Sequence, residues 1–574
     1  MKINFVKVFA SMAMAFGVMG SAYAQTNLGA SCGCPAVGSR TTVNVSGMTG
    51  AVAIAGDADA YELTSGATFT CNNTYILDKK IYVPAGQTLT IAPGTLIKGA
   101  AGATAADATA LVIERGGKII ASGTEDCPIV FTAAADGLNG NFPINSTGQW
   151  GGVVILGKAT NNLGALNTPQ TFGSKIGMGA GLGLVEGFNN TGAHNRFGVL
   201  TSGTVAGETV GTFNDDDNSG IMRYVSIRHT GVSLEVGAEI NGLTLGSVGR
   251  GTTLEHIEIV SCGDDNIELF GGTVNLKYIT TLFGNDDMLD YDLGWTGKCQ
   301  FFFGMKNDTN GSVDADNGIE GDADDNKSNY TPRSHPVIYN ATILGSAKAT
   351  GTSDNSGLAA IQAKELTEGE IYNSVFANFR NGLNMVKSLG TGRAYPVGES
   401  WNNWYATGST GDATNGNGSQ SLKVKCNTFV GVTNAITSGA TSAAFGTALT
   451  GTELTQFTTT DKNDIVSGNT LPGFDYTFTR SGNTFSAKND PTPNPALSVV
   501  GCPVAPFDGF FEPASYRGAF SSEYGDNWLS NWSYSTVLNA TKGISACPTD
   551  LNYDGQTNVS DFLIFAPAFG TSCN

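Results

Sequence analysis

Short segments that alternate apolar and polar residues recur along the middle of the chain. Apolar side chains stand at every second position of each copy, which is typical of a β-strand with one buried face. The clearest copies are residues 222–227, 254–259, 276–281, 338–343, 371–376 and 424–429. Earlier strands of the same kind are expected within 81–91, 110–120 and 150–157. The pattern therefore predicts a long series of short, half-buried strands.

The spacing of these strands predicts their arrangement. Leu254 and Leu276 occupy the same place in consecutive copies and lie 22 residues apart, about one coil of a parallel β-helix. Successive strands are too far apart for hairpins and are joined by too few residues for regular crossover helices, and longer intervals hold insertions at 306–334 and 345–357. The sequence thus predicts an all-β protein, a right-handed parallel β-helix over residues 76–435. A propeller or a sandwich would show hairpin turns at much shorter spacing.

The start of the chain indicates export. Residues 1–24 are expected to be a signal peptide, with Lys2 and Lys7 before a short apolar run and a small-residue cleavage site at 22–24. No later apolar stretch reaches the roughly 18 residues that a membrane helix needs. The protein is therefore expected to be secreted or at the cell surface. The other expected divisions are an N-terminal segment and cap at 25–75, a C-terminal cap region at 436–545 and a C-terminal module at 546–574.

The composition and net charge of the chain indicate which kinds of binding partner are favoured. Charged residues make up only 14% of the chain and 77 of 574 residues are glycine, which fits a turn-rich β solenoid. Removing the two signal-peptide lysines leaves 29 basic and 50 acidic residues, a net charge of −21. Nucleic acid is disfavoured as a partner by this charge, whereas cations and basic surfaces are favoured.

The ten cysteines all follow the expected signal peptide. An even number of cysteines in an exported protein favours disulfides over metal sites. Only the pair Cys547 and Cys573 is suggested by proximity, because these two residues bracket the small terminal module. The others are Cys32, Cys34, Cys71, Cys127, Cys262, Cys299, Cys426 and Cys502.

One acidic pentad occurs three times in the repeat region. The copies are 264–268, 286–290 and 316–320, and the first two are 22 residues apart, so their carboxylates are expected to stack on adjacent coils. Coils lie about 4.8 Å apart, so equivalent carboxylates repel unless a cation, a proton or a hydrogen-bond donor offsets them. The first interpretation is that Asp and Asn in these copies only shape a turn through side-chain hydrogen bonds, and a neutral copy at 380–384 supports it. The second interpretation is that acidic residues of these copies bind calcium. Besides the paired aspartates, the expected ligands are Glu268, Asp290, Asp316 and Glu320.

Several segments resemble a known superfamily. They are 150–157, 241–249, 270–275 and 516–520 with the following tryptophans Trp528 and Trp532. On these segments the chain is similar to the pectin-lyase-like β-helix superfamily, and more closely to uncharacterised secreted bacterial β-helix proteins. The resemblance covers most of the mature chain and implies the fold rather than an activity.

The first pentad also suggests a catalytic interpretation. Residues 263–267 resemble the paired-aspartate motif of polygalacturonase-type glycosidases, which use carboxylates as general acid and base. In this interpretation the catalytic carboxylates are Asp264, Asp265, Asp286 and Asp287. The Gly-His-Gly and Arg-Ile-Lys motifs of those enzymes are absent from the sequence. Resemblance to pectate lyases would instead require calcium and a basic side chain, and the lysines nearby in sequence are Lys277, Lys298 and Lys306.

Other prominent residues have structural explanations. His229 and His256 lie at or beside the repeated strands, where a structural histidine is expected more often than a catalytic one. The acid-rich loop 307–326 is either a solvated insertion or part of a calcium site. The aromatic residues of 510–532 are expected to cover the open end of the solenoid, although they also suit stacking on sugars.

A calcium-binding loop is expected near the C-terminus. Oxygen-bearing side chains stand at loop positions 1, 3, 5, 9 and 12, with Gly555 at position 6 and a backbone carbonyl at position 7. The ligands in this order are Asp550, Asn552, Asp554, Thr557, Asn558 and Asp561. The aspartate at position 12 resembles the dockerin type of loop, but a dockerin has two such loops and this tail has one. The module 546–574 is therefore expected to be a calcium-stabilised unit for sorting or surface attachment.

Two functions from different classes follow from the sequence. In the first, the protein is an extracellular, calcium-stabilised β-helix that binds glycans or cell-surface components without chemistry. In the second, it is a hydrolase or lyase acting on uronic-acid-rich polysaccharides through the paired aspartates. The sequence favours the first, because the base and histidine motifs of known mechanisms are missing.

Overall fold

The computed structural model describes most of the repeat region and the segments that pack against it. The described residues are 25–102, 108–163, 170–172, 175–185, 192–235, 238–306, 317–323, 331–345, 359–364, 367–386, 405, 422–439, 447–468, 471, 474, 480–481, 483–485, 492–493, 496–521 and 527–537. The expected signal peptide and the expected C-terminal calcium loop lie outside this set.

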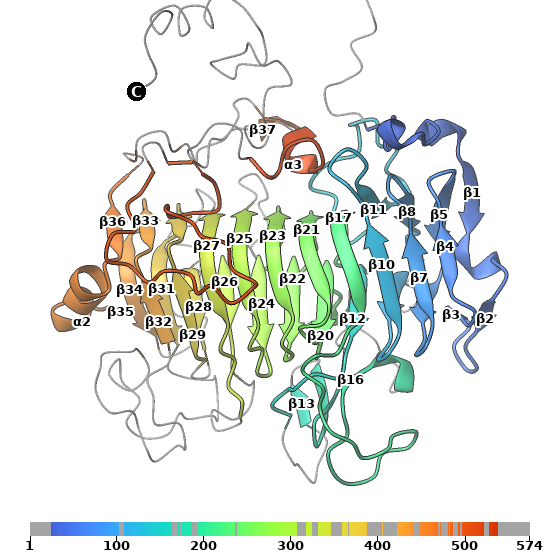
Figure 1. Cartoon of the computed structure of the whole chain (residues 1–574), viewed down its shortest axis with the longest axis horizontal. Helices are drawn as coiled ribbons and strands as arrows, with labels where there is room; N and C mark the ends of the chain where they lie inside the picture. The colour runs from blue at the N-terminus through green and yellow to red at the C-terminus, as the bar shows by residue number, and fades with distance from the viewer. Residues whose placement is uncertain are drawn as a thin grey trace, which may run out of the picture.

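The described chain winds into coils that form two long sheets, called sheet A and sheet B (Figure 1). Sheet A consists of β1 (Thr41–Asn44), β4 (Ala67–Phe69), β5 (Asn73–Leu77), β7 (Thr88–Ile91), β8 (Leu96–Gly99), β10 (Lys118–Ser122), β11 (Ile129–Ala133), β17 (Gly220–Arg228), β21 (Thr253–Val260), β23 (Asn275–Leu282), β25 (Lys298–Met305), β27 (Val337–Leu344), β29 (Gly369–Tyr372), β30 (Val375–Ala377), β32 (Leu422–Lys425), β33 (Thr428–Val430) and β36 (Asp464–Val466). Sheet B consists of β2 (Ala51–Ala53), β3 (Ala60–Leu63), β6 (Lys80–Val83), β9 (Ala110–Ile113), β12 (Val153–Leu156), β20 (Leu243–Gly246), β22 (Ile267–Phe270), β24 (Leu289–Asp292), β26 (Ile319–Gly321), β28 (Ala359–Ala363), β31 (Asn381–Val386), β34 (Asn434–Gly439) and β35 (Thr447–Ala448).

The remaining elements are small. Antiparallel strands project from the coils as β13 (Gln170–Phe172), β14 (Lys175–Gly179), β15 (Leu182–Leu184) and β16 (Arg196–Gly198), with short pairs β18 (Ser233–Glu235) and β19 (Ala238–Glu239), and β37 (Arg480–Ser481) and β38 (Thr484–Phe485). The helical turns are η1 (Ala30–Cys32), η2 (Val37–Ser39), η3 (Val45–Gly47), η5 (Ala193–Asn195), α2 (Thr452–Thr455), η8 (Gln456–Thr460) and α3 (Tyr534–Val537). None of these helices has the length and apolar character that crossing a bilayer requires, within the part of the chain that the structure describes.

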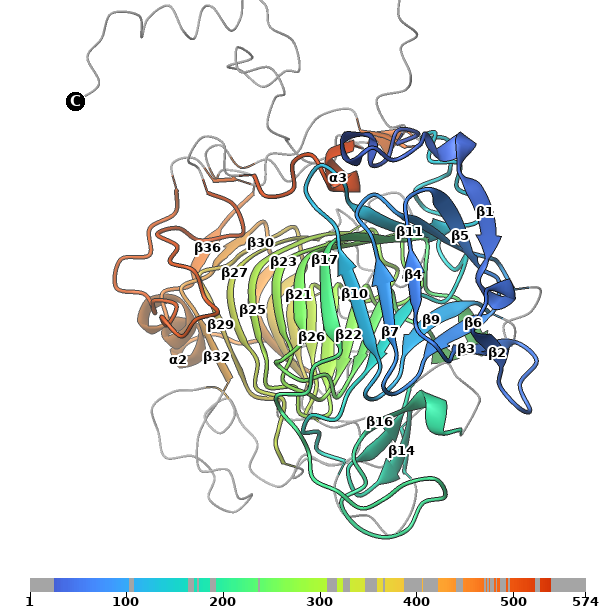
Figure 2. The ribbon, with the colours of Figure 1, turned by 45° about the vertical axis from the view of Figure 1, so that its right-hand side comes forward.

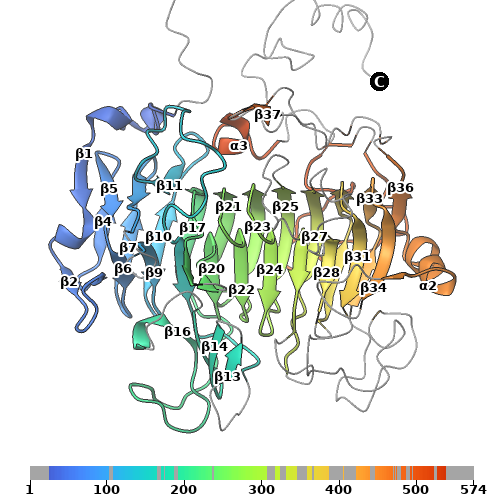
Figure 3. The ribbon, with the colours of Figure 1, turned by 180° about the vertical axis from the view of Figure 1, so that it is seen from behind.

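Parallel pairing between successive coils confirms the expected parallel β-helix. Leu254 of β21 lies opposite Leu276 of β23, the 22-residue register that the sequence predicted. In sheet B, strands β20 to β34 follow one another in chain order along the long axis (Figure 3). Parallel ladders begin at β1 and continue to β36, so they extend on both sides of the expected range 76–435.

The apolar positions of the repeated strands face a continuous core between the two sheets. Ile257 and Ile279 of sheet A belong to the same buried cluster as Ile267 and Leu289 of sheet B. Figure 2 shows the coils curving around this core. Since side chains alternate between the two faces of a strand, Glu268, which stands between Ile267 and Leu269, points away from the core.

Four neighbouring strands of sheet A bend at an aromatic residue. Tyr224, His256, Tyr278 and Phe301 have φ values of 50–58°, in the left-handed region that non-glycine residues rarely occupy. Their rings stack on one another, with centroids 4.3, 4.5 and 5.0 Å apart along the series. This stacking helps to offset the conformational cost of the bends. Burial lowers the pKa of His256 to about 4, so the imidazole serves as a neutral stacking ring.

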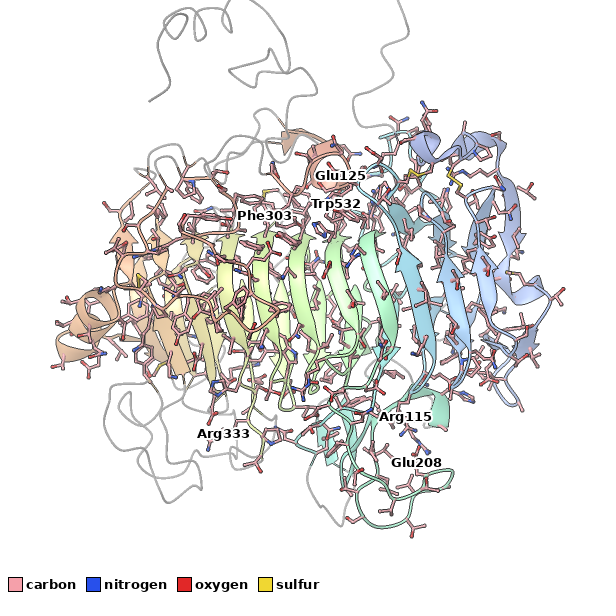
Figure 4. The ribbon with its side chains drawn as sticks, viewed as in Figure 1. Arg115, Glu125, Glu208, Phe303, Arg333 and Trp532 are labelled. Carbon is pink, nitrogen blue, oxygen red and sulfur yellow. A yellow bond between two sulfur atoms is a disulfide. The ribbon has the colours of Figure 1, made fainter. Side chains whose placement is uncertain are left out.

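A C-terminal strap, defined as residues 496–521 and 527–537, packs along the side of sheet A. The amide groups of Gln300 and Asn340 donate hydrogen bonds of 2.8 Å to its backbone carbonyls. Trp528 and Trp532 meet the aromatic stack, with the ring of Trp528 5.5 Å from that of Tyr278. Figure 4 places Trp532 near the edge of sheet A where Phe303 also lies.

The expectation that the aromatic residues of 510–532 cover the open end is therefore wrong. The rings of the bent strands project from the side of the solenoid, where the strap covers them in part and leaves Tyr224, His256 and Tyr278 half-buried. The C-terminal end is instead covered by α2 and η8 (Figure 1), and Phe457 of η8 completes the core.

Three disulfides join six of the eight described cysteines. Cys32 bonds to Cys127, Cys34 to Cys71 and Cys426 to Cys502, and the last bond fastens the strap to the coils. Cys262 and Cys299 are buried free thiols. The expectation that disulfides are favoured is confirmed for the other six described cysteines. The suggested pair Cys547 and Cys573 lies outside the described residues.

Candidate functional site: a carboxylate ladder on sheet B

The three pentads lie on adjacent coils of sheet B. Glu268 of β22 is opposite Asp290 of β24, and Asp290 is opposite Glu320 of β26. The stacking that the sequence predicted is therefore present. Asp316, the first residue of the third pentad, lies outside the described residues.

The second position of each pentad holds the turns together. Oδ1 of Asp265 accepts a hydrogen bond of 2.8 Å from the backbone N–H of Asp287. Asp287 accepts one from the backbone N–H of Asn317, and Asn317 accepts one of 3.0 Å from the backbone N–H of Ala359. The turn-shaping interpretation thus holds for this position, whether its side chain is an aspartate or an asparagine.

The side chains at the fifth position of each pentad stack into a second ladder. The type of side chain at this position changes along the solenoid. Towards the C-terminus the side chains are amides and a hydroxyl that bond in series. Thr437 donates to Asn384 at 2.8 Å, Asn384 donates to Gln362 at 3.0 Å, and Gln362 donates to Glu320 at 2.7 Å. Towards the N-terminus the same position is carboxylate on both Glu268 and Asp290.

Lys364 provides the positive charge on the third coil. Its Nζ contacts the carboxylate of Glu320 and lies 3.0 Å from that of Asp322. Burial alone would raise the pKa of Glu320, but Lys364 and the donors around the carboxylate hold it below its ordinary value. Glu320 is therefore compensated by the chain itself, which removes it from the expected calcium ligands.

Carboxylates converge on the first two coils. One oxygen from each of Asp264, Asp265 and Asp286 lies within 4.8 Å of the others, and the same holds for Asp265, Glu268 and Asp290. Asp265 belongs to both groups. Asp264 and Asp286 are half-buried, whereas the other three side chains are buried. We call these five residues the carboxylate cluster.

The environment of Asp265 shows what the cluster needs. Burial raises the pKa of this carboxyl well above its ordinary value, and the neighbouring carboxylates, Asp264 first, raise it further. A proton or a cation relieves both effects. Several carboxylate oxygens within a few ångströms are the ligands that hard divalent cations prefer, so the cluster fits calcium. Oδ1 of Asp287 accepts the hydrogen bond from the backbone N–H of Asn317 on the next turn. Asp287 is not one of the five residues of the carboxylate cluster.

A lysine that sequence reasoning left unplaced stands beside the cluster. Lys306, buried at the end of β25, donates a hydrogen bond from Nζ to the backbone carbonyl of Asp286. Lys277 and Lys298 lie elsewhere, because they pair with Glu512 and Asp508 of the strap. Aligning the strand ends would have indicated Lys306, since Met305 is in register with Leu282, just before the second pentad.

The histidines are not at the cluster. His229 is buried with its pKa lowered to about 4 by desolvation, and Nδ1 contacts the carbonyl of Ser146 at 2.8 Å. His256 belongs to the aromatic stack on the other sheet. Neither imidazole is among the groups that converge with the paired aspartates.

A cavity of about 240 Å³ lies between the strap and the aromatic stack, lined in part by Tyr278, Phe301, Glu512 and Trp528. Tyr278 is stacked between His256 and Phe301, and Trp528 is stacked on Phe520. These ring faces are used by protein contacts, so the cavity does not support the suggestion that they stack on sugars.

The architecture defines the class of protein: a parallel β-helix with a carboxylate cluster on one sheet. The chain belongs to the family described as the pectate-lyase-like β-helix domain, whose model matches residues 61–180 and 183–469. The crystal structure of pectate lyase Pel9A is a remote match, with 13% identity, coverage of 75% of this chain and 88% of that chain, and a TM-score of 0.23. No curated protein matches the chain. The fold supports a polysaccharide-acting protein, and together with the disulfides it is consistent with an extracellular one.

Proposed function

We propose that this protein binds acidic polysaccharide outside the cell through a calcium ion held by the carboxylate cluster. The observation that carries the proposal is the convergence of five carboxylates around Asp265 on adjacent coils. A chain of net charge −19 repels a polyuronate, so a bridging cation is needed to join the two. The half-buried Asp264 and Asp286 form the accessible rim at which such a polymer would meet the ion.

The test is binding of polygalacturonate to the purified protein, with calcium and with a chelator. Binding is expected with calcium and is expected to vanish with the chelator and in the Asp265→Asn variant. Lys298→Gln, on the opposite sheet, is the matched surface control and should bind normally. Equal binding with and without calcium would refute the bridging role.

A second candidate, eliminative cleavage of the same polymer, is favoured by the position of Lys306. In such a reaction a base removes the proton beside the uronate carboxyl, a carbon–carbon double bond forms, and the glycosidic oxygen leaves with a proton. A bound calcium would neutralise the uronate carboxylate and so make that proton more acidic. Lys306 is the basic side chain that the described structure places beside the cluster, and it would serve as the base.

The binding and lyase candidates are separated by measuring the release of unsaturated products by wild type and by the Lys306→Gln variant. If the protein is a lyase, wild type releases unsaturated products, and this variant loses their release while keeping calcium-dependent binding. If the protein only binds, wild type releases no such product from polygalacturonate or other acidic polysaccharides.

The C-terminal module remains a separate proposal. The ligand pattern from Asp550 to Asp561 supports a second calcium ion there and a role in sorting or attachment to a surface partner.

A further inference from the structure

A second group of metal-ligating side chains lies far from the carboxylate cluster, near the N-terminal end of sheet B. It consists of Glu62 of β3, Glu114 directly after β9, and His194 of η5. One oxygen of each glutamate and one ring nitrogen of His194 lie within 4.8 Å of one another. We propose that Glu62, Glu114 and His194 bind a zinc-like transition-metal ion.

The carboxylates of Glu62 and Glu114 both lie close to the same ring nitrogen of His194. Nδ1 of His194 is 2.8 Å from Oε1 of Glu114 and 3.3 Å from Oε1 of Glu62. In a tetrahedral zinc site with bonds of 2.0–2.1 Å, ligand atoms are roughly 3.3 Å apart. The two distances from the nitrogen are close to this separation, and all three atoms lie within 4.8 Å of one another. The fourth corner of such a site would be left for water.

The fold prepares the carboxylates independently of the histidine. Glu62 pairs with Tyr82 and Tyr82 pairs with Val112 across three adjacent strands. Glu114 is two residues beyond Val112 and so emerges on the same face of the sheet. Two carboxylates held side by side repel each other unless a proton or a cation offsets their charge. Two carboxylates are thus held together where a positive charge stabilises them.

The imidazole is held by contacts of its own. Its ring packs edge-on against that of Tyr82, with centroids 5.7 Å apart, and the hydroxyl of Tyr82 donates to Asn195 at 2.9 Å. The three side chains remain 14–28% exposed, so an ion can enter from solvent. Since imidazole is a poor ligand for calcium and a good one for zinc, the site differs chemically from the carboxylate cluster.

A second histidine provides a matched control. His335 also contacts two glutamates, but Glu368 lies 2.9 Å from Nδ1 and Glu370 lies 3.6 Å from Nε2. The two carboxylates are on opposite edges of the ring, so they cannot converge on one ion with the imidazole. His335 therefore has the same residue types in an arrangement that should not bind metal.

The experiment is calorimetric titration of zinc into untagged full-length protein at neutral pH, with calcium present to fill the carboxylate cluster. We expect one zinc ion to bind. We expect the affinity for zinc to fall by at least about tenfold in His194→Ala and in Glu62→Gln. Even the substitution of a residue that only hydrogen-bonds to a metal ligand commonly lowers metal affinity by that much. His335→Ala should bind zinc as wild type does.

Cobalt supplies a readout that a purely structural histidine would not change. Bound at this site in place of zinc, it should give visible absorption bands of a four-coordinate ion in wild type, and these should be lost in His194→Ala and in Glu62→Gln. Glu62→Gln keeps the size of the side chain, and its far-ultraviolet circular dichroism verifies that the fold is intact. Absence of zinc binding in wild type, or equal affinity in wild type and both variants, would overturn the proposal.

Discussion

Asp265 accepts, through Oδ1, a 2.8 Å hydrogen bond from the backbone N–H of Asp287 on the next coil. The same carboxyl lies within 4.8 Å of four other carboxylates. One side chain therefore closes a turn and forms the centre of the candidate calcium site. The two roles depend on different properties, since the turn needs an acceptor oxygen and the site needs a negative charge.

Substitutions at Asp265 should separate these roles. Asp265→Asn keeps the acceptor and removes the charge, so we expect solenoid calcium to be lost, while the unfolding midpoint measured with a chelator does not fall. Asp265→Ala also leaves the Asp287 N–H without its acceptor, which should lower the free energy of unfolding by about 1–3 kcal/mol. Calcium analysis and denaturant unfolding measure the two effects. Equal destabilisation by both variants would contradict the assignment.

The pH dependence of stability should depend on calcium. The folded-state pKa of Asp265 is raised, so the folded state binds more protons than the unfolded state. This contribution to stability is complete below the ordinary pKa of 3.8 and is lost as pH rises through the folded-state pKa. With a chelator, wild type should therefore lose stability relative to Asp265→Asn as the pH is raised from acid towards neutral. Saturating calcium should reduce that loss of stability. The Asp265→Asn variant should lack the part of the pH dependence of stability that comes from Asp265.

Removing Lys364 should expose the cost of burying Glu320. Lys364→Met leaves two buried carboxylates without their ammonium, and we expect a loss of roughly 3–5 kcal/mol at neutral pH. Because the folded-state pKa of Glu320 is lowered, its stabilisation is present above its ordinary pKa of 4.5 and is lost on acidification. Urea unfolding should therefore show a smaller effect of the variant in acid. Lys423→Met, at a more exposed pair with Glu370, should cost no more than about 1 kcal/mol.

The aromatic stack should tolerate His256→Phe. Since the pKa of His256 is lowered to about 4, the imidazole favours the folded state only while neutral, and its stabilisation is lost as pH falls below its ordinary value of 6.5. Phenylalanine keeps the ring and removes this acid sensitivity. Polysaccharide binding should be unchanged, and loss of binding would mean that His256 acts in the function. Trp532→Ala, by contrast, removes a fully buried ring and should cost about 3–5 kcal/mol in thermal or denaturant unfolding.

Deletion of residues 546–574 should remove one of two calcium ions. The ion that remains should disappear when Asp265→Asn is added, because it belongs to the carboxylate cluster. Metal analysis after dialysis against a buffer with low free calcium measures the stoichiometry. Loss of all calcium on deletion alone would leave the C-terminal loop as the sole site.

Much of the solenoid could be predicted from the sequence, because strand periodicity and coil length are local properties. The alternation in 254–259 and its repeat 22 residues later predict both the buried face of β21 and its register with β23. The same register predicts that Glu268 and Asp290 stack. Five of the proposed site residues were found in this way.

Contacts between distant segments were decided only by the tertiary structure. Lys306 reaches the carbonyl of Asp286, and Lys364 reaches Glu320, because long insertions between the coils do not change where the next strand lies. The strap packs on the side of sheet A because the bent strands present their rings there, which no local pattern shows. The sequence by itself determined the coils and the stacking of the acidic pentads, since both depend on short-range spacing. The tertiary structure decided which carboxylates converge, which one a lysine neutralises and where the C-terminal aromatics lie, since these depend on how remote segments pack.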